Sequence, residues 1–158
     1  MKTIFSRTGL FSLFLIMVFY CYGAGMIDYY GVYETWKLID AKDFTAVHHS
    51  QGDRIVALFV IPSAVMTLLN IFVLIFPPHY INRRIVLFAL IAYIFDWIFS
   101  FTMQIPIQLK LSEQKNMQLI DELLRTNWWR FGADTVQFVI VCWMLHGILK
   151  KHASLVNS

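Results

Sequence analysis

The sequence predicts an all-α integral membrane protein, a four-helix bundle that crosses the bilayer four times. Of its 158 residues, 58% are hydrophobic and only 15% are charged, which is typical of a membrane protein. Four stretches have the roughly 20 residues that are needed to cross a hydrocarbon core about 30 Å thick. These spans are residues 8–27, 54–76, 85–107 and 128–149. They indicate a single domain, residues 1–158, without a separate soluble domain.

The connection between the first two spans, residues 28–53, is the longest and most charged, and we expect a loop there. His48 and His49 are adjacent in it. Neighbouring residues on a helix point about 100° apart, so this pair lacks the spacing of metal ligands and we predict no metal site. A histidine in a solvent-exposed loop is usually hydrated, but His48 is also a candidate catalytic base.

The second and third spans each carry a polar stripe. Ser63, Thr67 and Asn70 recur at helical spacing in the second span, where Pro62 predicts a kink. Pro106 marks the outer end of the third span or a further kink. The polar side chains of the third span fall within an arc of about 120°. They are Asp96, Trp97, Ser100, Gln104 and Gln108.

Between the third and fourth spans, residues 111–125 predict a short, separate amphipathic helix. Asp121 has the i, i+4 spacing that pairs an acid with Arg125. The apolar side of this helix, with Ile120 and Leu124, would cover the outer mouth of the bundle.

The fourth span contains the most informative stripe. At about 100° per residue, Asn127, Arg130, Asp134 and Gln137 lie on one face of a helix. A charge near the bilayer centre costs roughly 2.5–3.5 kcal/mol, so Arg130 and Asp134 should face the bundle interior. We expect Arg130 to contact a carboxylate or another polar group of the third span. Pairing of Arg130 with Asp134 on the same helix is the alternative.

Helix register places the three stripes at similar depths, which predicts an outward-opening polar pocket. Asp96 and Asp134 would form its floor, Arg130 its rim, and the loop with His48 its lid. Asp96 should lie within hydrogen-bond reach of a polar residue from the second or fourth span. A purely structural role is the other interpretation, because polar contacts between helices are ordinary in membrane bundles.

The distribution of basic residues favours a topology with both termini in the cytoplasm and the bundle in the plasma (inner) membrane. The predicted inner segments are short and contain no acid. Their basic residues are Lys2, Arg7, Arg83, Arg84, Lys150 and Lys151. The net charge of +3 agrees with this topology. The sequence lacks a basic patch interleaved with aromatic residues, so we do not expect a nucleic-acid partner.

Four short motifs are spread over most of the chain. They are Phe44-Thr-Ala-Val-His48, Pro62, Thr102-Met-Gln-Ile-Pro-Ile-Gln108 and Leu123-Leu-Arg-Thr-Asn-Trp-Trp-Arg130. Together they resemble a family of small four-helix membrane proteins that includes the fungal anthrone oxygenases. The resemblance implies that His48, Gln104, Asn127 and Arg130 are functional positions and that the chemistry proceeds without metal or flavin.

The chain differs from the family pattern at two places. Gln108 stands where the family pattern leads us to expect a histidine. Asp134-Thr-Val-Gln137 stands where we expect a tryptophan and a second arginine.

The pocket and the resemblance predict an oxygenase-like oxidoreductase that acts on a small lipophilic aromatic or quinone-like molecule. This chemistry needs a base that forms a carbanion or phenolate and a cationic group that stabilises it. His48 or Asp96 is the predicted base and Arg130 the predicted stabiliser. The predicted substrate-binding residues are Ser63, Gln104, Gln108, Asn127 and Asp134.

No cofactor is predicted, and haem is the alternative. A bis-histidine haem needs two histidines at one depth, and only His146 lies within a span. The competing function class is a non-catalytic membrane subunit or small-molecule-binding protein, whose buried polar residues hold the bundle or a partner. Lipid is the expected surrounding, and a homo-oligomer or a partner membrane subunit is compatible with either hypothesis.

Overall fold

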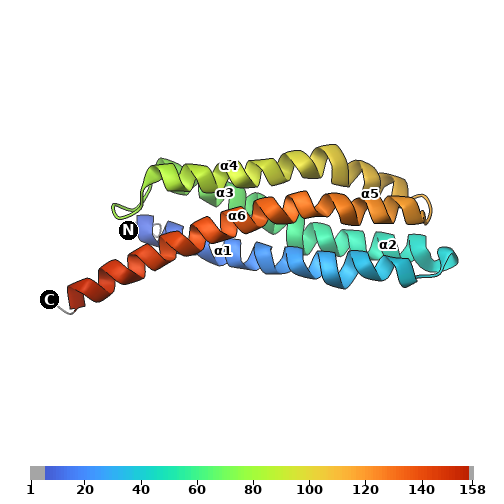
Figure 1. Cartoon of the computed structure of the whole chain (residues 1–158), viewed down its shortest axis with the longest axis horizontal. Coiled ribbons are helices and arrows are strands. Elements are labelled where there is room, and N and C mark those ends of the chain that lie inside the picture. Colours follow the sequence, from blue (N-terminus) through green and yellow to red (C-terminus); the bar gives the residue numbers. More distant parts are fainter. Residues whose placement is uncertain (1–5, 157–158) are drawn as a thin grey trace.

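The computed structural model describes residues 6–156, and every regular element in this part of the chain is a helix. Four long helices run alternately up and down (Figure 1), so the predicted all-α bundle is confirmed. The first consists of α1 (Arg7–Ile27), the π-helical η1 (Asp28–Tyr33) and the 3-10 helix η2 (Glu34–Leu38). The second consists of α2 (Ala41–Ile55), the π-helical η3 (Val56–Val60) and α3 (Ile61–Ile75). The third consists of α4 (Arg83–Phe99), the π-helical η4 (Ser100–Gln104) and α5 (Ile105–Leu111), and the fourth is α6 (Met117–Val156).

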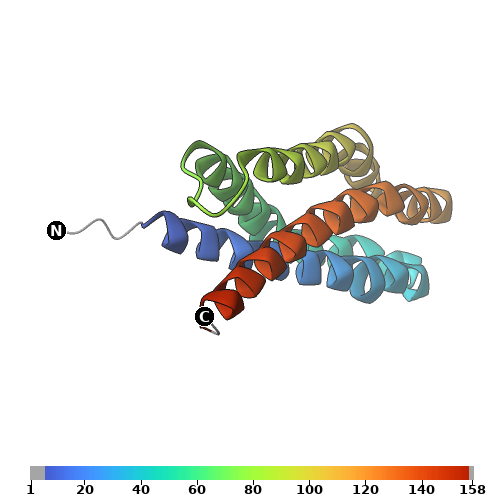
Figure 2. The same ribbon diagram turned by 60° about the vertical axis from the view of Figure 1, so that its left-hand side comes forward.

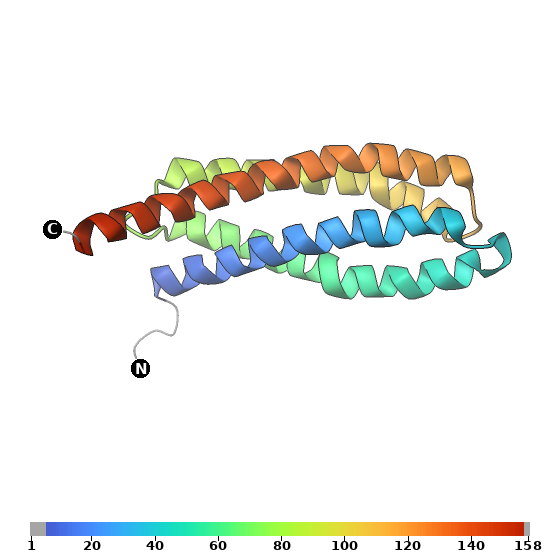
Figure 3. The same cartoon turned by 60° about the horizontal axis from the view of Figure 1, so that its bottom comes forward.

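Each long helix packs against two others. The first and the third both pack against the second and the fourth, which closes the bundle. The start of α1, the turn between α3 and α4 and the end of α6 lie at one end of the molecule, and α2 and α5 lie at the other (Figures 1 and 3). The last turns of α6 extend past the other helices (Figure 2).

All four helices are long and apolar enough to cross a membrane, which suggests a membrane protein. They cover the predicted spans but continue further toward the end that holds α2 and α5. The second helix, Ala41–Ile75, has 35 residues. At 1.5 Å per residue it is about 50 Å long, compared with about 30 Å for a hydrocarbon core. The helix is therefore longer than a hydrocarbon core is thick, and the span boundaries stay a prediction.

The predicted loop at residues 28–53 is wrong. The first long helix continues to Leu38, only Ile39 and Asp40 connect it to the next, and α2 begins at Ala41. The physical reason is a run of aromatic side chains that the helical conformation buries, of which Trp36 is fully buried.

The predicted separate amphipathic helix at residues 111–125 is also wrong. Leu111 ends α5, and α6 continues from Met117 into the fourth span without a break. Asn116 caps the start of α6, because its side-chain oxygen accepts a hydrogen bond from the amide of Leu119 at 3.2 Å. Asp121 forms an ion pair with Lys37 at 2.8 Å in place of the predicted pairing with Arg125.

Two apolar clusters hold the bundle together. The cluster at the α3–α4 end consists of Phe11, Phe14, Val18, Cys21, Met66, Leu69, Val73, Val86, Tyr93, Val141 and Met144. The cluster at the α2–α5 end consists of Tyr29, Tyr33, Trp36, Phe44, Ile107, Leu111, Ile120, Leu123 and Leu124. A polar layer lies between these clusters, in the middle of the bundle, and every long helix contributes to it. Its residues are Asp28, Ser63, Asp96, Ser100, Gln104, Asn127, Arg130, Asp134 and Gln137.

Candidate functional site

A buried ion pair joins the third and fourth helices in this polar layer. The Nε atom of Arg130 on α6 donates to the Oδ1 atom of Asp96 on α4 at 2.9 Å. The two side chains are only 11% and 4% exposed. The Nη1 atom of Arg130 also donates to the Oδ1 atom of Asn127, one turn earlier, at 3.3 Å. The expected contact of Arg130 with a carboxylate of the third span is confirmed, and so is the expected hydrogen bond of Asp96.

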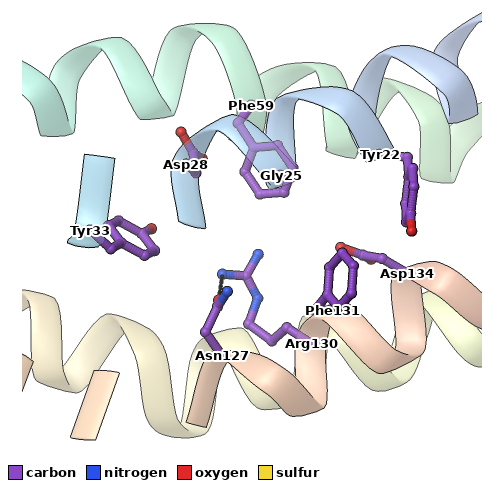
Figure 4. A pocket seen from close by; sticks show the side chains of 9 residues that line it. All are labelled: Tyr22, Gly25, Asp28, Tyr33, Phe59, Asn127, Arg130, Phe131 and Asp134. Atoms are coloured by element: carbon purple, nitrogen blue, oxygen red, sulfur yellow. Dashed lines mark hydrogen bonds between the residues drawn. The ribbon is translucent and has the colours of Figure 1, made fainter. Parts of the chain in front are cut away.

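The guanidinium group of Arg130 reaches into a small cavity between the first, second and fourth helices (Figure 4). Its volume is about 10 Å³, which is room for about one water molecule. With Nε and Nη1 bonded to Asp96 and Asn127, Nη2 has no acceptor among the described residues. The cavity is lined by Tyr22, Gly25, Asp28, Tyr33, Phe59, Asn127, Arg130, Phe131 and Asp134.

Acidic groups outnumber basic groups around this cavity. Asp28 and Asp134 line it, and Asp96 lies behind Arg130. Within residues 6–156, Asp96 is the one acid with an oxygen within 4.0 Å of Arg130. The alternative pairing of Arg130 with Asp134 is therefore not formed. The Oδ2 atom of Asp28 and the Oδ1 atom of Asp134 are buried and have no hydrogen-bond partner among the described residues.

Unpartnered polar atoms are numerous in the polar layer and in the apolar clusters beside it. Buried polar groups in folded proteins are nearly always hydrogen-bonded, so each exception needs an explanation. The buried side-chain atoms without a partner among residues 6–156 are Oδ2 of Asp28, Nδ1 of His48, Oγ of Ser63, Nδ2 and Oδ1 of Asn70, the hydroxyl of Tyr93, Oε1 of Gln104, Oδ1 of Asp134 and Nε2 of Gln137. A bundle interior with this many open donors and acceptors is suited to polar ligand atoms or water.

The backbone next to the site departs from regular α-helix in three of the long helices. Asp28 and Tyr33 lie on η1, Phe59 on η3 and Gln104 on η4, all of which are π-helical. Short π-helical segments inside α-helices occur frequently at functional sites. They re-aim the side chains that enter the polar layer.

A proline explains one of these segments. Pro62 lacks the amide that would bond the carbonyl of Leu58, four residues earlier. The hydroxyl of Tyr20 on α1 donates to this carbonyl instead, at 2.8 Å. Pro106 follows η4 in the same way. Pro62 is thus accommodated within a continuous helix because a neighbouring helix satisfies the free carbonyl.

His48 is the main correction to the predicted site. It lies on α2, is only 6% exposed, and packs against Trp36 and Phe44 in the cluster at the α2–α5 end. Its Nε2 atom is hydrogen-bonded to the Oε1 atom of Gln108 at 2.9 Å, and its buried Nδ1 atom has no partner within the described chain. His48 is therefore not a solvated lid, and it does not line the cavity of Arg130.

The other predicted residues divide between the cavity and its surroundings. Asn127 and Asp134 line the cavity together with Arg130. The Nε2 atom of Gln104 donates to the hydroxyl of Thr126 at 2.8 Å, outside the cavity lining. Ser63 is buried deeper, on α3.

Sequence reasoning missed several cavity residues, above all Asp28 and Tyr33. Both were assigned to the loop that proved to be helix. A signal for Asp28 was present, because it follows an apolar run without any intervening Gly-Pro or Asn-Gly turn and so continues the helix. Phe59 was missed because one aromatic residue in an apolar span looks like any lipid-facing side chain.

No group of three or more His, Cys, Asp or Glu side chains with metal-site geometry occurs in the described part of the chain. His146 is exposed on the outer face of α6.

Fold and site together define an all-helical protein with four helices of membrane-spanning length and a buried, charged polar centre. Comparison with protein-family models, curated proteins and solved structures found no match to this chain. The family resemblance of the short motifs therefore stays a prediction.

Proposed function

We propose that this protein is an integral membrane enzyme that binds an oxygen atom of a small lipophilic aromatic or quinone-like molecule at Arg130. The observation that carries the proposal is the guanidinium group itself, which is buried, fixed on one side by Asp96 and directed on the other side into a cavity. A preorganised cation in a site that excludes water stabilises a phenolate or enolate far better than the same group in water.

The proposed reaction is oxygenase-like, following the family resemblance, with dioxygen as the oxidant. A base removes a proton from an activated CH₂ group, and the resulting carbanion reacts with O₂ to a hydroperoxide, which loses water. The balance is R₂CH₂ + O₂ → R₂C=O + H₂O. Arg130 would hold the negative charge on the substrate oxygen during deprotonation.

The contacts favour a different base from the two that the sequence suggested. Asp96 is already bonded to Arg130, and His48 lies outside the cavity lining. Asp134 and Asp28 both line the cavity and carry unpartnered oxygens. Asp28 is the base that we propose, because it also lines a wider groove on the outside of the bundle with room for the carbon skeleton of the substrate, and Asp134 is the second carboxylate.

Anthrone is a suitable test substrate, because it contains an activated CH₂ group opposite a carbonyl. Purified protein in detergent should raise anthrone-dependent oxygen uptake above the uncatalysed background, with formation of anthraquinone. Arg130→Gln combined with Asp96→Asn removes both charges and should return uptake to background. Arg125→Gln changes an exposed arginine on the same helix and should leave uptake unchanged. Equal uptake by all three proteins would refute the proposal.

A visible absorption spectrum of the purified protein tests the haem alternative in the same preparation. A Soret band would replace the cofactor-independent mechanism by a haem-based one.

A non-catalytic membrane subunit or binding protein is the second candidate, and the Arg130–Asp96 pair also favours it. This pair is closed within the chain and joins two helices, as a structural clamp would. A protein of this kind would show no oxygen uptake above background in any variant, and it would lose stability when the pair is replaced. Size-exclusion chromatography in detergent then tests for a homo-oligomer or a partner subunit.

We also place the bundle in the plasma (inner) membrane with both termini in the cytoplasm. The basic residues Arg83 and Arg84 support this, since they begin α4 at the end of the bundle where α1 starts and α6 ends. Labelling of single cysteines introduced at this end with a membrane-impermeant reagent tests the orientation.

A further inference from the structure

A groove of about 530 Å³ runs along the outside of the bundle between the first and second long helices. Its lining is mostly apolar, and several of its side chains are exposed, including Ile27 and Leu58. Polar groups occur at Gln51, Arg54 and Asp28. The full lining is Phe19, Tyr20, Gly23, Ala24, Ile27, Asp28, Val32, Gln51, Arg54, Ile55, Leu58 and Phe59.

This groove adjoins the polar cavity of Arg130, because Asp28 and Phe59 line both. Phe59 is only 6% exposed, and its ring centroid lies 5.6 Å from the guanidinium carbon of Arg130. Figure 4 shows Phe59, Gly25 and Asp28 on the side of the cavity opposite Arg130. One aromatic ring on a π-helical segment therefore separates an apolar surface groove from the charged centre.

Glycine at position 25 leaves space beside the Phe59 ring, between the groove and the cavity. A Cβ atom at Gly25 would lie 3.5 Å from the Phe59 ring and 3.7 Å from the Oδ2 atom of Asp134. Both distances are ordinary van der Waals contacts, so an added methyl group would fill the space between Phe59 and Asp134 without a steric clash. Gly23, two residues earlier on the same helix, lines the groove and has no atom within 4 Å of such a Cβ.

We infer that the groove between α1 and α2–η3 binds the apolar body of the substrate and admits it from the hydrocarbon layer. The inference rests on the proposed function for the chemical class of the ligand, a lipophilic aromatic molecule with a phenolic or carbonyl oxygen. The cavity of about 10 Å³ holds one polar atom, whereas the groove has the 300–1,000 Å³ typical of a small-molecule site. The ring system lies in the groove, whose wall includes the proposed base Asp28, and the oxygen passes Phe59 to reach Arg130.

Photolabelling locates the site without requiring turnover. The probe is 4-hydroxybenzophenone, which combines a phenol with a photoreactive ketone, applied to the purified protein in detergent. Labelled peptides are mapped by mass spectrometry, with excess anthraquinone as competitor. We expect labels in residues 19–32 and 51–59, and loss of these labels on competition.

Two matched variants make the assignment sharp. Gly23→Trp fills the groove and should lower labelling of both segments by about tenfold or more, because the indole and the probe compete for one volume. Gly132→Trp makes the same change at an open glycine in a different apolar groove, between α4 and α6, and should leave the labelling of both segments unchanged.

A third variant, Gly25→Ala, tests the route from the groove to the cavity. It should keep the labelling but slow anthrone-dependent oxygen uptake about threefold, because the added methyl group lies between groove and cavity and not in the groove.

The outcomes separate this inference from the proposed function. Labels on the α4–α6 groove, sensitivity to Gly132→Trp, or labels spread evenly over all helices would overturn the access groove. Arg130-dependent oxygen uptake in the same preparation would then leave the enzymatic proposal intact. Conversely, competed labelling of residues 19–32 that is abolished by Gly23→Trp, without any oxygen uptake, would establish the groove and refute the oxygenase.

Discussion

Removing the charge of Arg130 should destabilise the bundle more than removing the charge of Asp96. Breaking one side of a buried ion pair costs about 3–5 kcal/mol, a large part of a typical stability of about 5–15 kcal/mol. Arg130→Gln leaves three carboxyl groups, those of Asp28, Asp96 and Asp134, without a cation in the layer. We therefore expect it near the upper end, about 5 kcal/mol. Asp96→Asn leaves Arg130 close to two other acids and should cost about 3 kcal/mol.

The double variant is the decisive measurement. With both residues replaced by amides, no uncompensated charge remains in the pair, and an amide–amide hydrogen bond can form. Its cost should be about 1–3 kcal/mol below the sum of the two single costs. Unfolding of the purified protein in mixed detergent–SDS micelles gives the three free energies, and Arg125→Gln serves as the exposed control. Costs that add to within about 0.5 kcal/mol would refute the direct coupling of Arg130 and Asp96.

Three further variants test individual contacts. His48→Ala should lower the melting temperature in detergent, because it removes a buried ring and its hydrogen bond, whereas His49→Ala on the exposed side of α2 should not; equal effects would contradict the buried position. Tyr20→Phe should cost about 1 kcal/mol, since the carbonyl of Leu58 loses its donor, and a variant as stable as the wild type in the same unfolding assay would argue against that bond. Asp121→Asn removes an exposed ion pair and should leave the melting temperature unchanged; a clear drop would mean that the pair is structural.

Hydrophobic length and helical periodicity carried the prediction of the fold. An apolar run of about 20 residues has few alternatives to a helix, because each backbone polar group must be bonded internally in lipid. The same approach failed at residues 28–53, where the residues are polar enough for a loop. There the helix is stabilised by burial of Tyr33 and Trp36 against Phe44 and the start of α6, and local sequence does not encode such long-range packing.

The sequence by itself determined that Arg130 faces inward and needs a polar partner, since the cost of a charge in lipid leaves no other place for it. It did not determine which partner. Asp134 has the i, i+4 spacing on the same helix, whereas Asp96 lies on another helix. The packing of α4 against α6 brings Asp96 into contact with Arg130, and this packing cannot be read from the local sequence. Tertiary structure also decided which residues share a cavity, bringing Asp28 in and placing His48 outside it. The physical reason is that periodicity fixes the face of each helix, whereas the rotation and axial offset between helices depend on side chains far apart in the chain.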